Sequence, residues 1–198
     1  YRFDKDAENP RRPARREDRL GDIEEIRYLN QKAWGANVGL DRPGLYQFVI
    51  ETQPWWSQSE AGYERHIVKT MLPVFGEDWG WDLPLGLSHE IVPLVRPFGL
   101  FSPALFAARV LVNGKPAAGV PVQVFRINTE KTKVPTPWHE EMHLRTLPDG
   151  TFAVVLNRAG WWCCTATREG APLKGPDGQP SPLKESALFW LYVDAQGK

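Results

Sequence analysis

One short run of the sequence has the residue types and the spacing of a metal site. Residues 139–143 read His-Glu-Glu-Met-His, which matches the H-E-x-x-H pattern of zinc proteases as a string. That chemistry requires a helix, because a helix places both histidines on one face beside the glutamate. Pro135 and Pro137 before the run, and a turn at residues 148–150 after it, leave no room for such a helix. We therefore expect a protein that is not an enzyme.

As a β-strand, the same run offers a different kind of metal site. Side chains at alternate positions of a strand share one face and lie about 7 Å apart along it. His139, Glu141 and His143 would then line one side of the strand. Two imidazoles and a carboxylate suit nickel, copper or zinc, and two of the three could share one ion near the strand's end. The alternative interpretation is the polar, solvent-facing side of an edge strand.

The other two of the four histidines stand apart from this run. His66 falls on an expected strand over residues 63–74, near a loop that carries Trp55 and Trp56. It is a candidate metal ligand, and a hydrogen-bonded structural histidine is the alternative. His89 begins another expected strand, and we interpret it as an ordinary surface or interface residue.

Tryptophan is abundant, with nine residues in the chain. Trp55, Trp56, Trp79 and Trp81 are expected near the junction of two β-rich halves, where large aromatic rings bury much area. A sugar-stacking surface is the alternative, because indole rings stack on the faces of sugars. At residues 161–162, two adjacent tryptophans on a strand predict one ring inside the core and one outside.

The composition limits the class of protein. The 198 residues are 42% hydrophobic, which allows one large domain or two small ones with a core. The 24 basic and 24 acidic residues balance, so no strong attraction to nucleic acid or to an anionic membrane is expected. The most basic run, residues 11–16, has acidic neighbours and no interleaved aromatic residue, and we interpret it as part of a solvated loop. Cys163 and Cys164 are adjacent, so they form no disulfide framework and should face opposite sides of a strand.

Short apolar runs between turn-forming residues predict an all-β protein. In the first half we expect strands over residues 34–38, 45–51 and 63–74, a strand or helical turn over 23–29, and a loop over 53–62. The second half has seven strand-like runs at a spacing typical of an immunoglobulin-like sandwich. They cover residues 89–95, 104–112, 120–127, 139–146, 151–157, 161–168 and 186–193. A long Gly/Pro-rich segment over 169–182 is expected to be a loop.

We divide the chain into two immunoglobulin- or transthyretin-like β-sandwich units. Residues 1–84 are expected to form a partial N-terminal β-sandwich and residues 85–198 a C-terminal immunoglobulin-like β-sandwich. The first unit shows about four or five strands, where a closed sandwich needs about seven. We expect it to be incomplete at its N-terminus, in a chain that begins with Tyr1 rather than Met. An open sheet edge of this kind could pair with a neighbouring protein chain or another copy.

Several motifs run in the order of a known family. They are RPGLY at residues 42–46, EIVPL at 90–94, RPFGL at 96–100 and RAGWW at 158–162. With these motifs the chain resembles the NikK-like group of periplasmic β-sandwich proteins linked to nickel and cobalt uptake. The resemblance implies an exported, periplasmic or extracellular protein that presents a divalent transition metal (nickel, cobalt or zinc) to a membrane metal transporter subunit.

Two functions of a different class stay open at this point. A structural or adhesive module of a cell-surface or extracellular assembly would use the incomplete first unit to pair with a neighbour. A carbohydrate-binding module would use the clustered tryptophans as a stacking surface.

Overall fold

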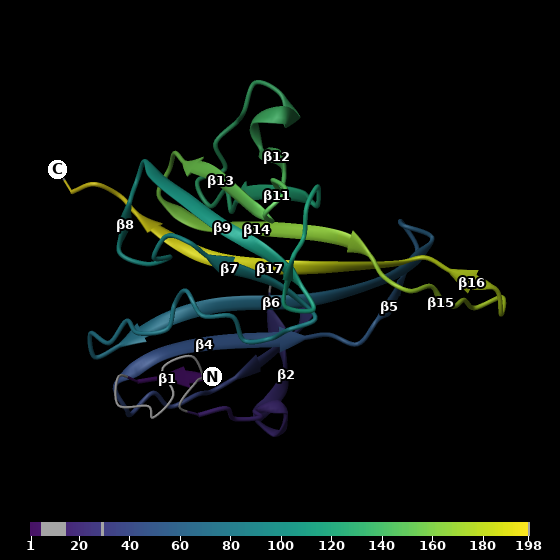
Figure 1. Ribbon diagram of the computed structural model, residues 1–198, viewed down its shortest axis with the longest axis horizontal. Helices are drawn as coiled ribbons and strands as arrows, with labels where there is room; N and C mark the ends of the chain where they lie inside the picture. The colour runs from purple at the N-terminus through teal and green to yellow at the C-terminus, as the bar shows by residue number, and fades with distance from the viewer. Residues whose placement is uncertain (5–14, 29, 198) are drawn as a thin grey trace.

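The protein is a β-sandwich in the computed structural model, which describes residues 1–4, 15–28 and 30–197 (Figure 1). The predicted all-β class is confirmed. The larger of the two stacked sheets is extended by two short strands, β5 (Trp55–Ser57) beside β6 and β8 (Leu100–Phe101) beside β17. Its main strands follow the order β1 (Arg2–Phe3), β4 (Gly44–Glu51), β6 (Gly62–Val74), β17 (Leu183–Asp194), β14 (Gly160–Glu169), β11 (Pro121–Arg126) and β12 (Glu141–Arg145).

The smaller sheet covers one part of the larger one. Its strands are β10 (Lys115–Pro116), β9 (Ala104–Val112), β13 (Thr151–Leu156) and β7 (His89–Pro93). Two hairpins stand outside both sheets, and they consist of β2 (Ile23–Tyr28) with β3 (Gln31–Ala36), and of β15 (Leu173–Lys174) with β16 (Pro180–Ser181). Two 3-10 turns, η1 (Leu20–Asp22) and η2 (Pro137–His139), complete the described elements.

The core lies between the two sheets and follows from alternation along the strands. On β17 every second residue from Ala187 to Val193 is buried, and the residues between them face the other way. Phe189 stacks on Phe106 of β9 with ring centroids 5.7 Å apart, and Phe106 meets the ring of Phe152 at 6.3 Å. We call the core-facing side of the large sheet its inner face and the opposite side its outer face.

The large sheet contains strands from both halves of the chain. β6 and β17 pair in parallel, with Tyr63 opposite Leu183 and Thr70 opposite Trp190. One sheet therefore includes strands from both sides of the domain boundary that the sequence suggests between residues 84 and 85. The division into two units stays a prediction. Of the described residues, no helix has the length and apolar character needed to span a membrane.

Several expected elements were wrong in detail. The expected loop over residues 53–62 contains β5, and the segment over 169–182 contains the β15–β16 hairpin. The expected solvated loop at the N-terminus contains β1, whose Phe3 is buried where Gly80 (φ 93°) lets the backbone approach its ring. Most of the basic run over 11–16 lies outside the described residues.

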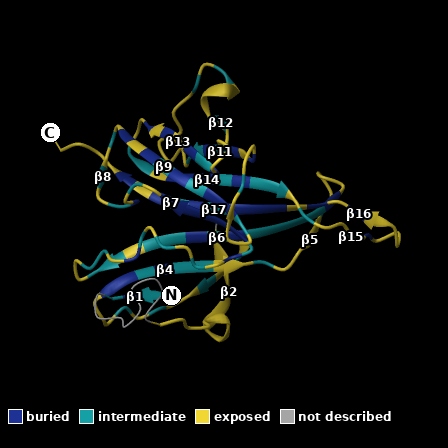
Figure 2. Ribbon diagram, in the orientation of Figure 1, coloured by how far each residue is buried: buried dark blue, intermediate teal, exposed yellow. Residues whose placement is uncertain are grey.

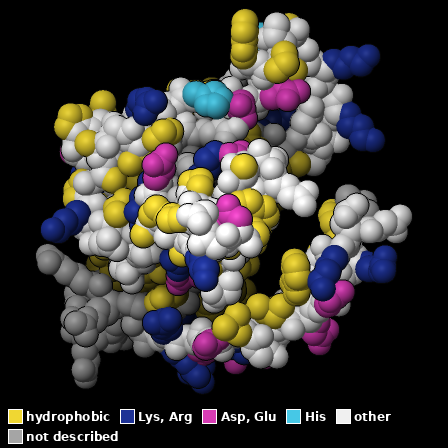
Figure 3. Space-filling model, turned by 90° about the vertical axis from the view of Figure 1, so that its right-hand side faces the viewer, with side chains coloured by type: hydrophobic (Ala, Val, Ile, Leu, Met, Phe, Trp, Pro, Cys, Tyr) yellow, Lys and Arg dark blue, Asp and Glu magenta, His cyan; other side chains and the backbone are white. Residues whose placement is uncertain are grey.

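The β2–β3 hairpin is an arm that stands off the body. Its strands pair only with each other, and every residue of β2 is exposed (Figure 2). Figure 3 shows this arm at the lower edge of the molecule, with a hollow between it and the body. An isolated two-stranded hairpin is at best marginally stable in water.

Candidate functional site

Glu141 and His143 form an exposed pair on β12, which ends the large sheet among the described strands. Alternation along the strand points both side chains to the outer face, where His143 lies opposite Gln123. The His143 Nε2 atom is 2.7 Å from Oε1 of Glu141, and the side chains are 70% and 37% exposed. The hydrogen bonds from His143 and from the Gln123 amide lower the pKa of Glu141. The pair can supply an imidazole and a carboxylate to one ion.

His139 does not lie on this strand, so the expectation that three side chains share one strand face was wrong. Pro137 begins a 3-10 turn at that point, and the Glu140 N–H closes it on the Pro137 carbonyl. The Nδ1 atom of His139 lies 2.9 Å from the Thr136 hydroxyl. The strand begins only at Glu141, because the fixed φ of proline favours the turn.

His66 lies on the outer face of the same sheet but far from the pair. Four strand spacings separate β6 from β12, which places His66 and His143 roughly 19 Å apart. The His66 ring packs edge-on against Trp55 at 4.6 Å, and its Nε2 atom is 3.6 Å from Glu64. Burial lowers the pKa of His66 and favours a neutral imidazole. His66 and His143 cannot hold the same ion.

Within the described ranges, no three histidine, cysteine or carboxylate side chains converge as a metal cluster. The structure brings together two of the four predicted ligands, Glu141 and His143. His139 and His66 lie elsewhere. That these residues bind a metal stays a prediction.

The centre of the outer face is apolar and uncharged. Trp190 meets the ring of Phe125 at 5.7 Å, and Trp161 meets Tyr192 at 5.4 Å. A shallow cavity of about 390 Å³ opens beside them. Thr70, Ile127, Trp161 and Trp190 line it. The face consists of Tyr46, Phe48 and Ile50 on β4, Val68, Thr70 and Leu72 on β6, Leu188, Trp190 and Tyr192 on β17, Trp161, Cys163 and Thr165 on β14, and Gln123 and Phe125 on β11.

The tryptophans divide between core and surface. Trp162 is 4% exposed and Trp161 is 47% exposed, which confirms the prediction that one ring faces inward and one outward. Trp55, Trp56 and Trp79 are each more than a third exposed. Trp55 packs edge-on against His66 and Trp56 against Tyr63, both on β6, and a packing role at a junction of two halves stays a prediction. The adjacent cysteines are free thiols, and both are buried.

The EIVPL motif forms a buried anchor that sequence reasoning did not identify as one. The Glu90 carboxylate accepts a 2.7 Å hydrogen bond from the Lys69 ammonium of β6. It also accepts backbone N–H bonds from Leu85, Gly86 and Leu87 at 2.9 to 3.3 Å. Burial lowers the pKa of Lys69, and the carboxylate beside it favours the charged form. The anchor fixes the link between the halves, and β7 is buried throughout.

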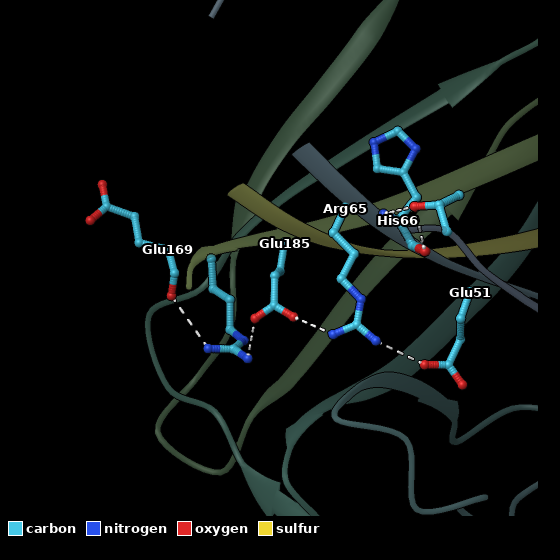
Figure 4. Close-up of polar contacts among 7 residues, drawn as sticks. Glu51, Arg65, His66, Glu169 and Glu185 are labelled. Carbon is cyan, nitrogen blue, oxygen red and sulfur yellow. Dashed lines mark hydrogen bonds and ion pairs between the residues drawn. The ribbon is translucent and has the colours of Figure 1, made fainter. Parts of the chain in front are cut away.

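A row of alternating charges crosses the inner face beside this anchor (Figure 4). Arg65 reaches Glu51 at 3.1 Å and Glu185 at 3.3 Å, and Arg168 reaches Glu185 at 2.6 Å. The Glu185 side chain is 8% exposed, so its two arginine partners offset the cost of burying its charge. This row stabilises the junction of β6, β17 and β14.

His89 is fully buried beside that row, so its interpretation as a surface or interface residue was wrong. Neither ring nitrogen meets hydrogen-bond geometry with a partner among the described residues. Burial, and then the charge of Arg168, lower the pKa of His89 from 6.5 to about 4, while the backbone of Glu185 acts in the opposite direction. The histidine is held neutral inside the sandwich.

The model of the family described as "Domain of unknown function (DUF4198)" matches residues 3–170, and the chain belongs to this family. No curated protein matches the chain.

Proposed function

We propose that the protein is an exported, non-enzymatic binding protein of nickel or cobalt uptake, which holds a divalent transition metal for a membrane transporter. The observation that carries the proposal is the convergence of His143 and Glu141 within 2.7 Å at the exposed end of the large sheet. The resemblance of the EIVPL, RPFGL and RAGWW motifs to periplasmic nickel and cobalt uptake components supports the metal and the location outside the cytoplasm.

An exposed pair of ligands suits transfer better than storage. A closed structural site surrounds its metal with four protein ligands. Glu141 and His143 provide two, so water or a partner protein completes the coordination of the ion. A transporter can replace those water ligands without unfolding the donor. Imidazole and carboxylate ligands accept nickel, cobalt and zinc.

Calorimetric titration with nickel, cobalt and zinc tests this proposal. We expect one ion per chain, and at least a tenfold loss of affinity in His143→Ala and in Glu141→Ala. His66→Ala is the matched control, because it removes a histidine from the same face about 19 Å away. Wild-type binding no tighter than about millimolar, or unchanged affinity in His143→Ala, would overturn the site.

Delivery is tested with membrane vesicles that contain a nickel transporter. Nickel-loaded wild-type protein should raise the initial rate of uptake above that of the same total nickel free in buffer. His143→Ala protein should give the rate of free nickel. Equal rates for the two proteins would separate metal binding from delivery and reject the second step.

A further inference from the structure

Two apolar surfaces of the molecule have no cover from the described residues, and they differ in shape. The first is the β2–β3 arm, where Ile26 is 43%, Tyr28 67% and Trp34 65% exposed. These side chains lie on both sides of the hairpin, since Trp34 pairs with Glu25 and Ile26 with Ala33. The Lys32–Glu25 ion pair at 2.7 Å satisfies two of its charges within the hairpin. The arm is therefore a narrow, largely neutral element with apolar side chains on each side.

The second surface is the outer face of the large sheet. Ile50 is 61%, Leu72 45% and Trp161 47% exposed, and among the described residues the central rows of this face between β4 and β11 carry no charged side chain. Glu64, Lys184 and Glu169 lie on the same face at one end of their strands. A contiguous apolar face of five strands is larger than the scattered apolar residues of an ordinary monomer surface. Its shallow cavity beside Trp161 and Trp190 has the volume of a large side chain or more, about 390 Å³.

We propose that two copies of the chain form a symmetric dimer in which the β2–β3 arm of each copy packs on the outer face of the large sheet of the other. The arm makes no substantial contact with its own body among the described elements, so it is free to reach a second chain. An isologous dimer forms this arm-to-face contact twice, once in each direction. Each contact covers an unsupported hairpin and an open apolar face together.

The area of these contacts is sufficient for a stable dimer. A large aromatic side chain presents about 150 to 250 Å², and the arm and the face each expose several large side chains at about half of their surface. Only one side of the arm can lie on the face, so one arm-to-face contact buries on the order of 300 Å² on each surface, and two contacts bury about 1,200 Å² in total. Stable protein interfaces bury about 1,200 to 2,000 Å². The dimer does not depend on metal binding.

The state of association is measured by sedimentation velocity and light scattering at chain concentrations from about 1 to 100 μM, a range that brackets ordinary dimer affinities. We expect a wild-type particle of twice the 22.5 kDa chain mass. Trp34→Glu on the arm and Leu72→Glu on the face should each shift the dimer to monomer. Leu105→Glu is the matched control, because Leu105 is 57% exposed on the small sheet. It should leave the dimer intact.

Mixing the two variants distinguishes arm exchange from other dimers. The Trp34→Glu chain keeps an intact face and the Leu72→Glu chain keeps an intact arm, so the mixture retains one of the two contacts. We expect a heterodimer at concentrations where each variant alone is monomeric. Circular dichroism and melting temperature verify that both variants are folded. A monomeric wild type at 100 μM, a dimer unaffected by Trp34→Glu, or a mixture that stays monomeric would overturn the proposal.

Discussion

His89 should make the protein sensitive to acid in a predictable window of pH. The residue is fully buried and its pKa is lowered from 6.5 to about 4. The unfolded chain therefore binds this proton more readily than the folded chain between these two values. Stability from the neutral histidine is complete above pH 6.5 and is lost as the pH falls toward 4. After burial, the positive charge of Arg168 is the next cause of this lowered pKa, because a protonated His89 would be a second positive charge near it.

The size of the effect follows from the pKa shift. One pKa unit corresponds to about 1.4 kcal/mol, so the lowering amounts to about 3 kcal/mol of unfolding free energy between neutral pH and pH 4. Since neither ring nitrogen of His89 makes a hydrogen bond with a described residue, replacing the ring with an apolar side chain leaves none of these residues without a partner. His89→Leu should then be no less stable than wild type at low pH. Its free energy of unfolding should lack the pH dependence that the buried imidazole causes between pH 6.5 and 4.

Urea unfolding of wild type and His89→Leu at several values of pH between 4 and 8 measures this effect. The stability of His89→Leu relative to wild type should rise by about 3 kcal/mol as the pH falls from 7.5 to 4. Groups that titrate equally in both proteins cancel in the difference. A difference between His89→Leu and wild type that is constant with pH would refute this account of the buried histidine.

Three further outcomes test the packing and the thiols. Glu90→Gln should lower the free energy of unfolding in urea by about 3 kcal/mol, because it leaves the Lys69 ammonium buried without its ion partner. Lys69→Met should lower it by less. A larger loss in Lys69→Met than in Glu90→Gln would contradict the role of Glu90 as the anchor. In thermal unfolding, Gly150→Ala should destabilise by about 2 kcal/mol and Gly114→Ala by about 1. Both glycines have positive φ, but only at 150 would an added Cβ lie 2.8 Å from a backbone oxygen. Cys163, whose pKa burial raises to about 11, should not react with a thiol reagent at pH 8 before urea unfolds the chain, and rapid native reaction would contradict its burial.

The sequence predicts strands well where one face is apolar and a turn follows. Residues 104–112 form β9 with the predicted bounds, because the run is apolar except for Arg109 and Asn113-Gly114 ends the strand. Pairing partners are a different matter. The parallel contact of Tyr63 with Leu183 joins segments 120 residues apart, and periodicity identifies the faces of a strand but not its neighbour.

The site was only partly predictable for the same physical reason. Glu141 and His143 are two residues apart on one strand, so local alternation alone brings them together. The partner of Glu90 is Lys69 on another strand, and the charge of Glu185 is balanced by Arg65 and Arg168 from two others. Such polar residues resemble surface residues until the fold supplies their partners.

The assignment of the metal ligands is tested most directly by NMR of ¹⁵N-labelled histidine side chains during titration with zinc, which is diamagnetic. We expect the Nε2 resonance of His143 to shift first and to saturate at one ion per chain. The ring resonances of buried His89 should stay unchanged. A titration in which His143 does not respond, or in which His66 responds alone, would contradict a metal site at Glu141 and His143.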